Sequence, residues 1–83
     1  LFYKFSTTDG DINFAINFID QSGNSTPVLP MTRYPSDETE ITGKCEFNSA
    51  GIAVLIWDNS HAWYGSKILK YLAHVRKVFI TAL

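Results

Sequence analysis

Asp58, His61 and His74 are the residues whose chemistry first suggests a site, because a carboxylate and two imidazoles can hold a metal ion or exchange protons. Their spacing does not support this. His61 follows Asp58 closely, His74 lies on a later segment, and no Glu, Asp or Cys stands at metal-ligand spacing to either histidine. Asp58 is better explained as a turn former. The sequence therefore predicts no metal site and no bound cofactor.

Cys45 is the single cysteine of the chain and the other candidate for reactivity. A nucleophilic thiol needs a nearby base or positive charge, and no His–carboxylate pair is placed by the sequence to activate this one. Cys45 alternates with apolar neighbours, which favours a buried, unreactive thiol. One cysteine cannot form an internal disulfide, which indicates a reducing compartment. We expect a protein that is not an enzyme.

Two groups of side chains are better suited to binding than to catalysis. Trp57, Trp63 and Tyr64 cluster around a polar loop, and aromatic side chains of this kind anchor protein partners. Trp57 is expected in the core, so the candidates for partner binding are His61, Trp63 and Tyr64. The alternative is that the loop folds back and caps the end of the domain. The second group is basic and consists of Lys67, Lys70, Arg76 and Lys77. These residues are candidates for binding anionic phospholipid; the alternative is that they form a plain solvated face.

The residues around this loop predict two strands. Ile52–Trp57 is a short apolar run rich in β-branched and aromatic side chains, which is typical of a buried strand. Asp58, Asn59 and Ser60 end it, because such side chains bond to nearby backbone N–H groups. The chain resumes at Lys67 as a returning strand. Leu69, Tyr71, Ala73 and Val75 fall on one side of it, and Lys70 and His74 on the other.

This stretch resembles the closing hairpin of the GOLD (Golgi dynamics) domain. The resemblance is carried by Gly51, Leu55, the run Trp57-Asp58-Asn59-Ser60, the pair Ser66-Lys67, and then Leu69, Tyr71 and Val75. Upstream, Phe2–Phe5 and the run Asp11-Ile12-Asn13-Phe14 are similar to the opening strands of that family. The sequence departs from the family pattern at Ala53, where Tyr or Val is frequent, and at His61-Ala62, where Tyr-Ser is frequent.

The rest of the chain also predicts strands and turns. Leu1–Ser6, Ile12–Ile19 and Ile41–Phe47 alternate between apolar and polar residues, as half-buried strands do. The prolines at positions 27, 30 and 35 predict an edge strand or an irregular crossing between them. Ser36–Glu40 is expected to be a solvated, acidic loop. The predicted core is made of Phe14, Phe18, Leu55, Trp57 and Tyr71.

Composition fits one small all-β domain. The chain has 83 residues, 46% of them apolar, and a formal net charge of −1, which argues against a nucleic-acid module. We expect a small antiparallel β-sandwich over residues 1–76, and a strand extension or connector over residues 77–83. The GOLD resemblance implies a jelly-roll-type sandwich. Members of that family usually have a further strand before the one that corresponds to Leu1–Ser6, so we expect this strand to be missing here and one sheet edge to be open. No run approaches the length of a transmembrane helix.

The resemblance implies a function in membrane traffic. GOLD domains recruit proteins or cargo at Golgi and endosomal membranes, so we expect a non-catalytic protein-interaction module of a larger protein. Its expected location is cytoplasmic, on those membranes, rather than lumenal. The alternative function is the binding of anionic phospholipid headgroups through the basic face. The formal glycosylation acceptor at Asn24 is expected to arise by chance.

Overall fold

The computed structural model describes residues 1–60 and 66–75, and within these ranges every regular element is a β-strand. The six strands lie close to the alternating segments of the sequence, because period-two alternation lets one side of a strand be buried and the other solvated. Their bounds are β1 Phe2–Thr7, β2 Ile12–Asp20, β3 Ser25–Tyr34, β4 Ile41–Lys44, β5 Gly51–Asp58 and β6 Leu69–His74.

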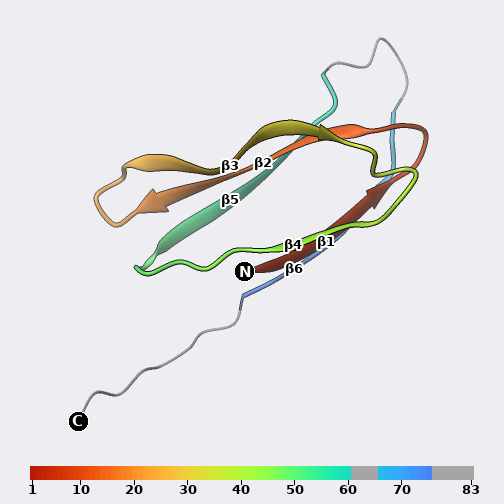
Figure 1. Cartoon of the computed structure of the whole chain (residues 1–83). Coiled ribbons are helices and arrows are strands. Elements are labelled where there is room, and N and C mark those ends of the chain that lie inside the picture. The colour runs from red at the N-terminus through yellow and green to blue at the C-terminus, as the bar shows by residue number, and fades with distance from the viewer. Residues whose placement is uncertain (61–65, 76–83) are drawn as a thin grey trace.

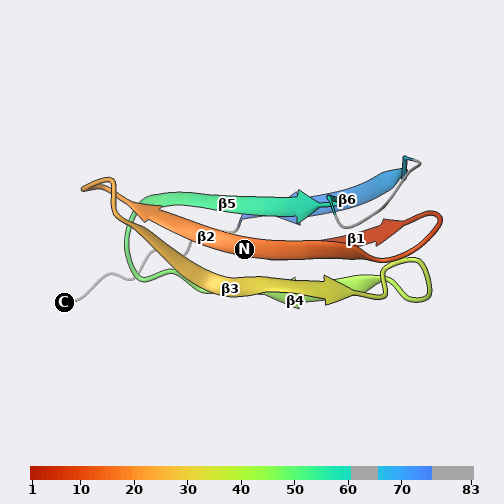
Figure 2. The same cartoon turned by 90° about the horizontal axis from the view of Figure 1, so that it is seen from above.

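The strands form two antiparallel three-stranded sheets, ordered β4-β1-β6 and β3-β2-β5. The sheets face each other in a sandwich-like arrangement, with β5 over β6, β2 over β1 and β3 over β4 (Figures 1 and 2). The prediction of an all-β fold built from antiparallel sheets is confirmed.

The hairpin between β2 and β3 joins neighbouring strands of one sheet. Its turn is held by Asp20, whose Oδ1 accepts hydrogen bonds from the backbone N–H groups of Ser22 and Asn24, both at 2.9 Å. β3 lies at the edge of its sheet and carries irregular pairing beside Pro27 and Pro30. An edge strand is where proline is tolerated, so this part of the prediction is confirmed.

The predicted closing hairpin is wrong. Among the described strands, β5 pairs with β2 and β6 pairs with β1, so the two strands belong to different sheets. Alternation specifies which side of each strand is apolar, but it does not specify which strand is the hydrogen-bonded neighbour.

The core gathers at one end of the sandwich. Phe5 and Phe14 are 1% and 0% exposed, with ring centroids 4.6 Å apart across the two sheets. Ile12, Ile16 and Tyr3 complete the buried cluster, and Leu55 and Trp57 are half-buried against it. Phe14 is therefore a core residue as predicted.

Two of the predicted core residues lie elsewhere. Tyr71 points toward the other sheet, where its ring lies 4.9 Å from that of Trp57, but it is 63% exposed because β6 is an edge strand. Phe18 is half-buried and stacks on Phe47 rather than on the core cluster. Figure 1 shows the reason: the β2–β3 hairpin extends past the start of β1, and of the described chain the connector after β4 lies beneath it in place of a strand.

Ser36 corrects the expectation of a wholly solvated acidic loop. It is 2% exposed, and its Oγ lies 2.6 Å from the Oγ1 of Thr7 in a hydrogen bond. The backbone N–H of Thr7 also donates to the carbonyl of Ser36 at 3.0 Å. The loop is thereby attached to the end of β1, while residues 37–40 remain exposed. β4 is likewise shorter than predicted and ends at Lys44.

Candidate interaction surfaces

The apolar outer face is the solvent side of the sheet β3-β2-β5. Register places Ile19 opposite Ile52, Asn17 opposite Val54 and Ala15 opposite Ile56. Phe14 and Ile16 of the same strand point into the core, so these intervening residues point outward. Met31 of β3 lies on the same side, beside a pairing irregularity opposite Ala15. We define the apolar outer face by Ala15, Ile19, Met31, Ile52, Val54 and Ile56.

This face is partly accessible to solvent. Ile52 is 63% exposed and Met31 46%, while Ile19, Val54 and Ile56 are half-buried by their neighbours. Charged side chains stand only near its ends, where Arg33 Nε lies 3.5 Å from Asp11 Oδ2 and Asp58 closes β5. A contiguous apolar patch with charges at its margin is typical of a protein-interaction site.

β5 is the reason that the face is apolar. Alternate residues of β5 point to the core, yet the residues between them are also apolar, so both sides of the strand are hydrophobic. Such strands are usually buried on both faces. The predicted strand is present, but it is not fully buried: its inward residues are half-buried, and its outer side meets solvent because β5 lies at the edge of its sheet.

Gly51 fixes the start of β5. A side chain at this position would collide with the backbone oxygen of Ile19 and with the ring of Phe18. The close approach of β5 to β2 therefore requires glycine here. This gives a structural role to one residue of the sequence motif that begins at Gly51.

The lysine face is the solvent side of the other sheet, β4-β1-β6. Register places Lys4 between Thr42 and Leu72, and Phe2 between Lys44 and His74. Lys70 lies beside Ser6 on the same side. We define the lysine face by Lys4, Lys44 and Lys70 together with the exposed apolar residues Phe2 and Leu72, which are 42% and 48% exposed.

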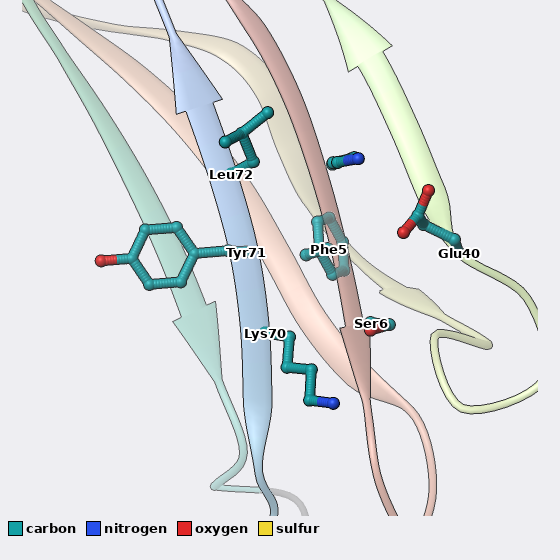
Figure 3. Close-up of a pocket in the computed structure, with 7 residues that line it drawn as sticks. Phe5, Ser6, Glu40, Lys70, Tyr71 and Leu72 are labelled. Carbon is teal, nitrogen blue, oxygen red and sulfur yellow. The ribbon is translucent and has the colours of Figure 1, made fainter.

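A shallow hollow on the lysine face is lined by Lys4, Ser6, Glu40, Lys70 and Leu72, with Phe5 and Tyr71 beside it. Figure 3 shows Lys70 on one side of β1 and Glu40 on the other, while Tyr71 extends from β6 away from both. One carboxylate, Glu40, beside the two ammonium groups of Lys4 and Lys70 leaves the hollow with an excess of positive charge.

Two residues of the predicted basic face, Lys67 and Lys70, lie in the part of the chain that the structure describes. Lys70 belongs to the lysine face, but Lys67 does not, because its Nζ donates a hydrogen bond to the backbone oxygen of Asp11. Arg76 and Lys77 lie outside the described residues. Sequence reasoning missed Lys4 and Lys44. Alternation with inward-pointing neighbours indicates that each points outward, but it does not show that their strands are paired, so their common face could not be predicted.

The predicted partner loop cannot be compared with the structure. His61, Trp63 and Tyr64 lie outside the described residues, as do residues 76–83. At the start of the loop, Asp58 Oδ1 accepts a hydrogen bond from the backbone N–H of Ser60 at 2.7 Å. This confirms Asp58 as a turn former.

An open groove lies at the end of the sandwich away from the core. Its apolar lining includes Leu1, Phe18, Phe47, Ala53 and Val75. The rings of Phe18 and Phe47 are stacked with centroids 4.7 Å apart. Cys45 also lines the groove and is a half-buried free thiol rather than a fully buried one.

Tyr3 lies where the groove meets the core. It is 7% exposed, and its ring lies 5.2 Å from that of Phe14. Burial raises the pKa of the Tyr3 hydroxyl, and the nearby Cys45 and Tyr34 raise it further, because each disfavours the phenolate. Tyr3 therefore stays neutral in the folded protein beyond the pH at which an ordinary tyrosine ionises.

Neither a metal-ligand cluster nor a membrane-spanning helix is found in the described residues. Within residues 1–60 and 66–75, no three His, Cys, Asp or Glu side chains come together as metal ligands. In the same ranges there is no helix with the length and hydropathy needed to cross a bilayer. His74 lies on the exposed side of β6, next to Phe2.

Comparison with known proteins adds no relative. No family model, no curated protein and no solved structure matches this chain. The surfaces described above are therefore the basis for inferring function.

Proposed function

We propose that this chain is a non-catalytic protein-interaction module and that its apolar outer face binds a protein partner. The observation that carries the proposal is the apolar row Ile52, Val54 and Ile56 beside Met31, on a sheet face without charges at its centre. Ile52 is 63% exposed and Met31 46%, while Val54 and Ile56 are half-buried. Burial of apolar area on association contributes about 25 cal/mol per Å² before the costs of association. A domain that exposes such a row gains free energy when a partner buries it.

The resemblance to GOLD domains suggests the cellular setting. The motif from Gly51 to Tyr71, the antiparallel sheets and the glycine-dependent entry into β5 are consistent with a GOLD-like, jelly-roll-type sandwich. On that basis we place the module in a larger membrane-trafficking protein on the cytoplasmic side of Golgi or endosomal membranes, where it recruits an adaptor or cargo protein. Trp63 and Tyr64 remain candidates for additional partner contacts.

Met31→Lys tests this proposal. Met31 projects from the apolar outer face and is 46% exposed, so a lysine there can reach water and the fold is retained. A partner captured by the wild-type chain should bind this variant about tenfold more weakly, since a buried ammonium without a counter-charge opposes docking.

Leu72→Lys is the matched control. Leu72 is 48% exposed and lies on the lysine face, so the chemical change is the same on the opposite side of the molecule. Circular dichroism and the thermal midpoint verify that both variants are folded. Equal binding by Met31→Lys and wild type, or equal losses in both variants, would exclude the apolar outer face as the site.

A second candidate function is binding of anionic phospholipid headgroups by the lysine face. The specific observation is the register that interleaves Lys4, Lys44 and Lys70 with exposed Phe2 and Leu72. Lysines near an anionic membrane contribute about 1 kcal/mol each, and the apolar side chains can enter the interface. This surface shares Lys70 with the basic face expected from the sequence and adds Lys4 and Lys44.

Co-sedimentation with phosphatidylcholine vesicles, with and without a phosphoinositide, tests the second candidate. Lys70→Glu should weaken binding to the anionic vesicles, and Arg33→Glu, an equal charge reversal at the margin of the apolar outer face, should not. Binding that is independent of phosphoinositide, or equally sensitive to both substitutions, would exclude a headgroup site on the lysine face.

A further inference from the structure

The four sheet edges differ in how well they are protected against strand pairing. An edge strand offers unpaired N–H and C=O groups to any other strand, and proteins block this with prolines, bulges, lysines or short strands. β3 carries two prolines and irregular pairing. β4 has four residues and ends in Lys44, and β6 carries Lys70 and His74.

β5 has none of these protections. It runs for eight residues, with no proline, no charge before Asp58 and no irregularity in its pairing with β2. Among the described residues, the central part of β5 from Ile52 to Ile56 pairs with no strand on the side away from β2. Both sides of the strand are apolar, and a long apolar edge strand without protection readily pairs with another strand.

We propose that the free edge of β5 pairs with the β5 edge of a second copy of this chain, forming a symmetric dimer with a continuous six-stranded sheet. Antiparallel pairing of identical strands is the closed, two-fold arrangement that most homodimers use. The pairing makes β5 a central strand of the combined sheet. It requires no other protein, so it does not depend on the partner binding proposed above.

The distribution of charge along β5 favours a second copy of the same strand as the partner of this edge, because self-pairing brings no like charges together. When Val54 faces its own counterpart, Ile52 lies opposite Ile56 and Ala53 opposite Leu55, so every central pair is apolar and no like charges meet. A shift that centres the pairing on Leu55 would instead place Ile52 opposite Asp58. Self-pairing of β6 would place the charged side chain of Lys70 within the new strand pair, where a lysine opposes pairing.

The dimer also enlarges the apolar outer face. The rows Ile52, Val54 and Ile56 of the two copies would lie side by side across the two-fold axis, leaving one contiguous apolar surface on the combined sheet. Tyr71, which is 63% exposed at the same side of the sandwich, would lie near the new interface.

Sedimentation velocity of the 83-residue chain over a wide concentration range tests the proposal. The expected result is a concentration-dependent shift from the 9.4 kDa monomer to twice that mass. Ile52→Lys and Val54→Lys should each hold the chain at the monomer mass, because a lysine on an edge strand opposes pairing. Ile52 is 63% exposed, so its variant stays folded even if Val54→Lys does not.

Two controls separate edge pairing from other association. Leu72→Lys and Met31→Lys introduce the same charge away from the β5 edge and should dimerise like wild type. Amide exchange adds a direct readout, since the β5 N–H groups that face away from β2 should lose protection on dilution. A monomer at every concentration, or a dimer that survives both β5 variants, would overturn the proposal, whatever the outcome for partner binding.

Discussion

Phe14 and Phe18 have the same place in the alternating pattern of one strand, but their environments in the folded molecule differ. Both lie on β2, and both point to the inner side of the same sheet. Phe14 is 0% exposed and contacts Phe5, Tyr3 and Trp57, whereas Phe18 is half-buried and contacts Phe47 at the open groove. Alternation therefore identifies the inner side of a strand, but the facing sheet decides how much of that side is buried.

We call the end of the sandwich that holds the core cluster around Phe5 and Phe14 the closed end, and the end with the groove beside Phe18 the open end. The two ends should differ in their contribution to the free energy of unfolding. The closed end has rings from both sheets and a hydrogen bond between Thr7 and Ser36 that ties its loop in place. The open end has one stacked pair and a groove. A small domain has a free energy of unfolding of about 5–15 kcal/mol, so substitutions of a few kcal/mol are readily measured.

The largest effect is expected for Phe14→Ala. Removing this fully buried ring leaves a cavity between the sheets and should lower the free energy of unfolding by about 3–5 kcal/mol. Urea unfolding followed by tryptophan fluorescence measures the change. A loss below about 1 kcal/mol would show that the sheets are not packed at this end as described.

Phe18→Ala should cost less, about 1–2 kcal/mol, because the side chain is already half-exposed and its removal opens no closed cavity. The same urea series gives the ratio of the two effects. Equal losses at Phe14 and Phe18 would mean that the open end is covered in solution, and the contrast between the ends would then be wrong.

Ser36→Ala should cost about 1 kcal/mol, since it removes a buried hydroxyl–hydroxyl bond while the Oγ1 of Thr7 still donates to the carbonyl of Gly10. Ser49→Ala, at an exposed serine lining the groove, is the matched control and should be neutral. If both substitutions leave the thermal midpoint unchanged, the Thr7–Ser36 bond does not stabilise the closed end.

The smallest effect is a dependence on pH at Tyr3, which lies between the two ends. Its pKa in the folded state is raised, so the unfolded chain loses this proton first as the pH rises above about 10. The stability contributed by neutral Tyr3 is present below that pH and is lost as the pH rises through the folded-state pKa.

Unfolding midpoints at neutral and alkaline pH measure this effect. Tyr3→Phe should lose less stability than wild type between the two conditions, because phenylalanine does not ionise. A variant with the same alkaline loss as wild type would show that burial of Tyr3 is not its cause.

The sequence by itself determined the local properties of this protein. Alternation in residues 1–20 predicted two strands with the correct inner sides, because a strand of period two can bury only one set of side chains. Asp58 predicted a turn, since its carboxylate can bond to a backbone N–H two residues away. Proline positions predicted an edge strand at β3.

Only the tertiary structure decided which strands are neighbours and which surfaces are exposed. β5 and β6 follow each other in the chain, yet they pair with β2 and β1 in different sheets, and no local pattern distinguishes this from a hairpin. The lysine face exists because register brings Lys4, Lys44 and Lys70 from three strands to one side. Tyr71 alternates like a core residue but is exposed, because β6 has a neighbour on one side only. Burial is a property of the neighbours as well as of the residue, and the neighbours are set by long-range pairing.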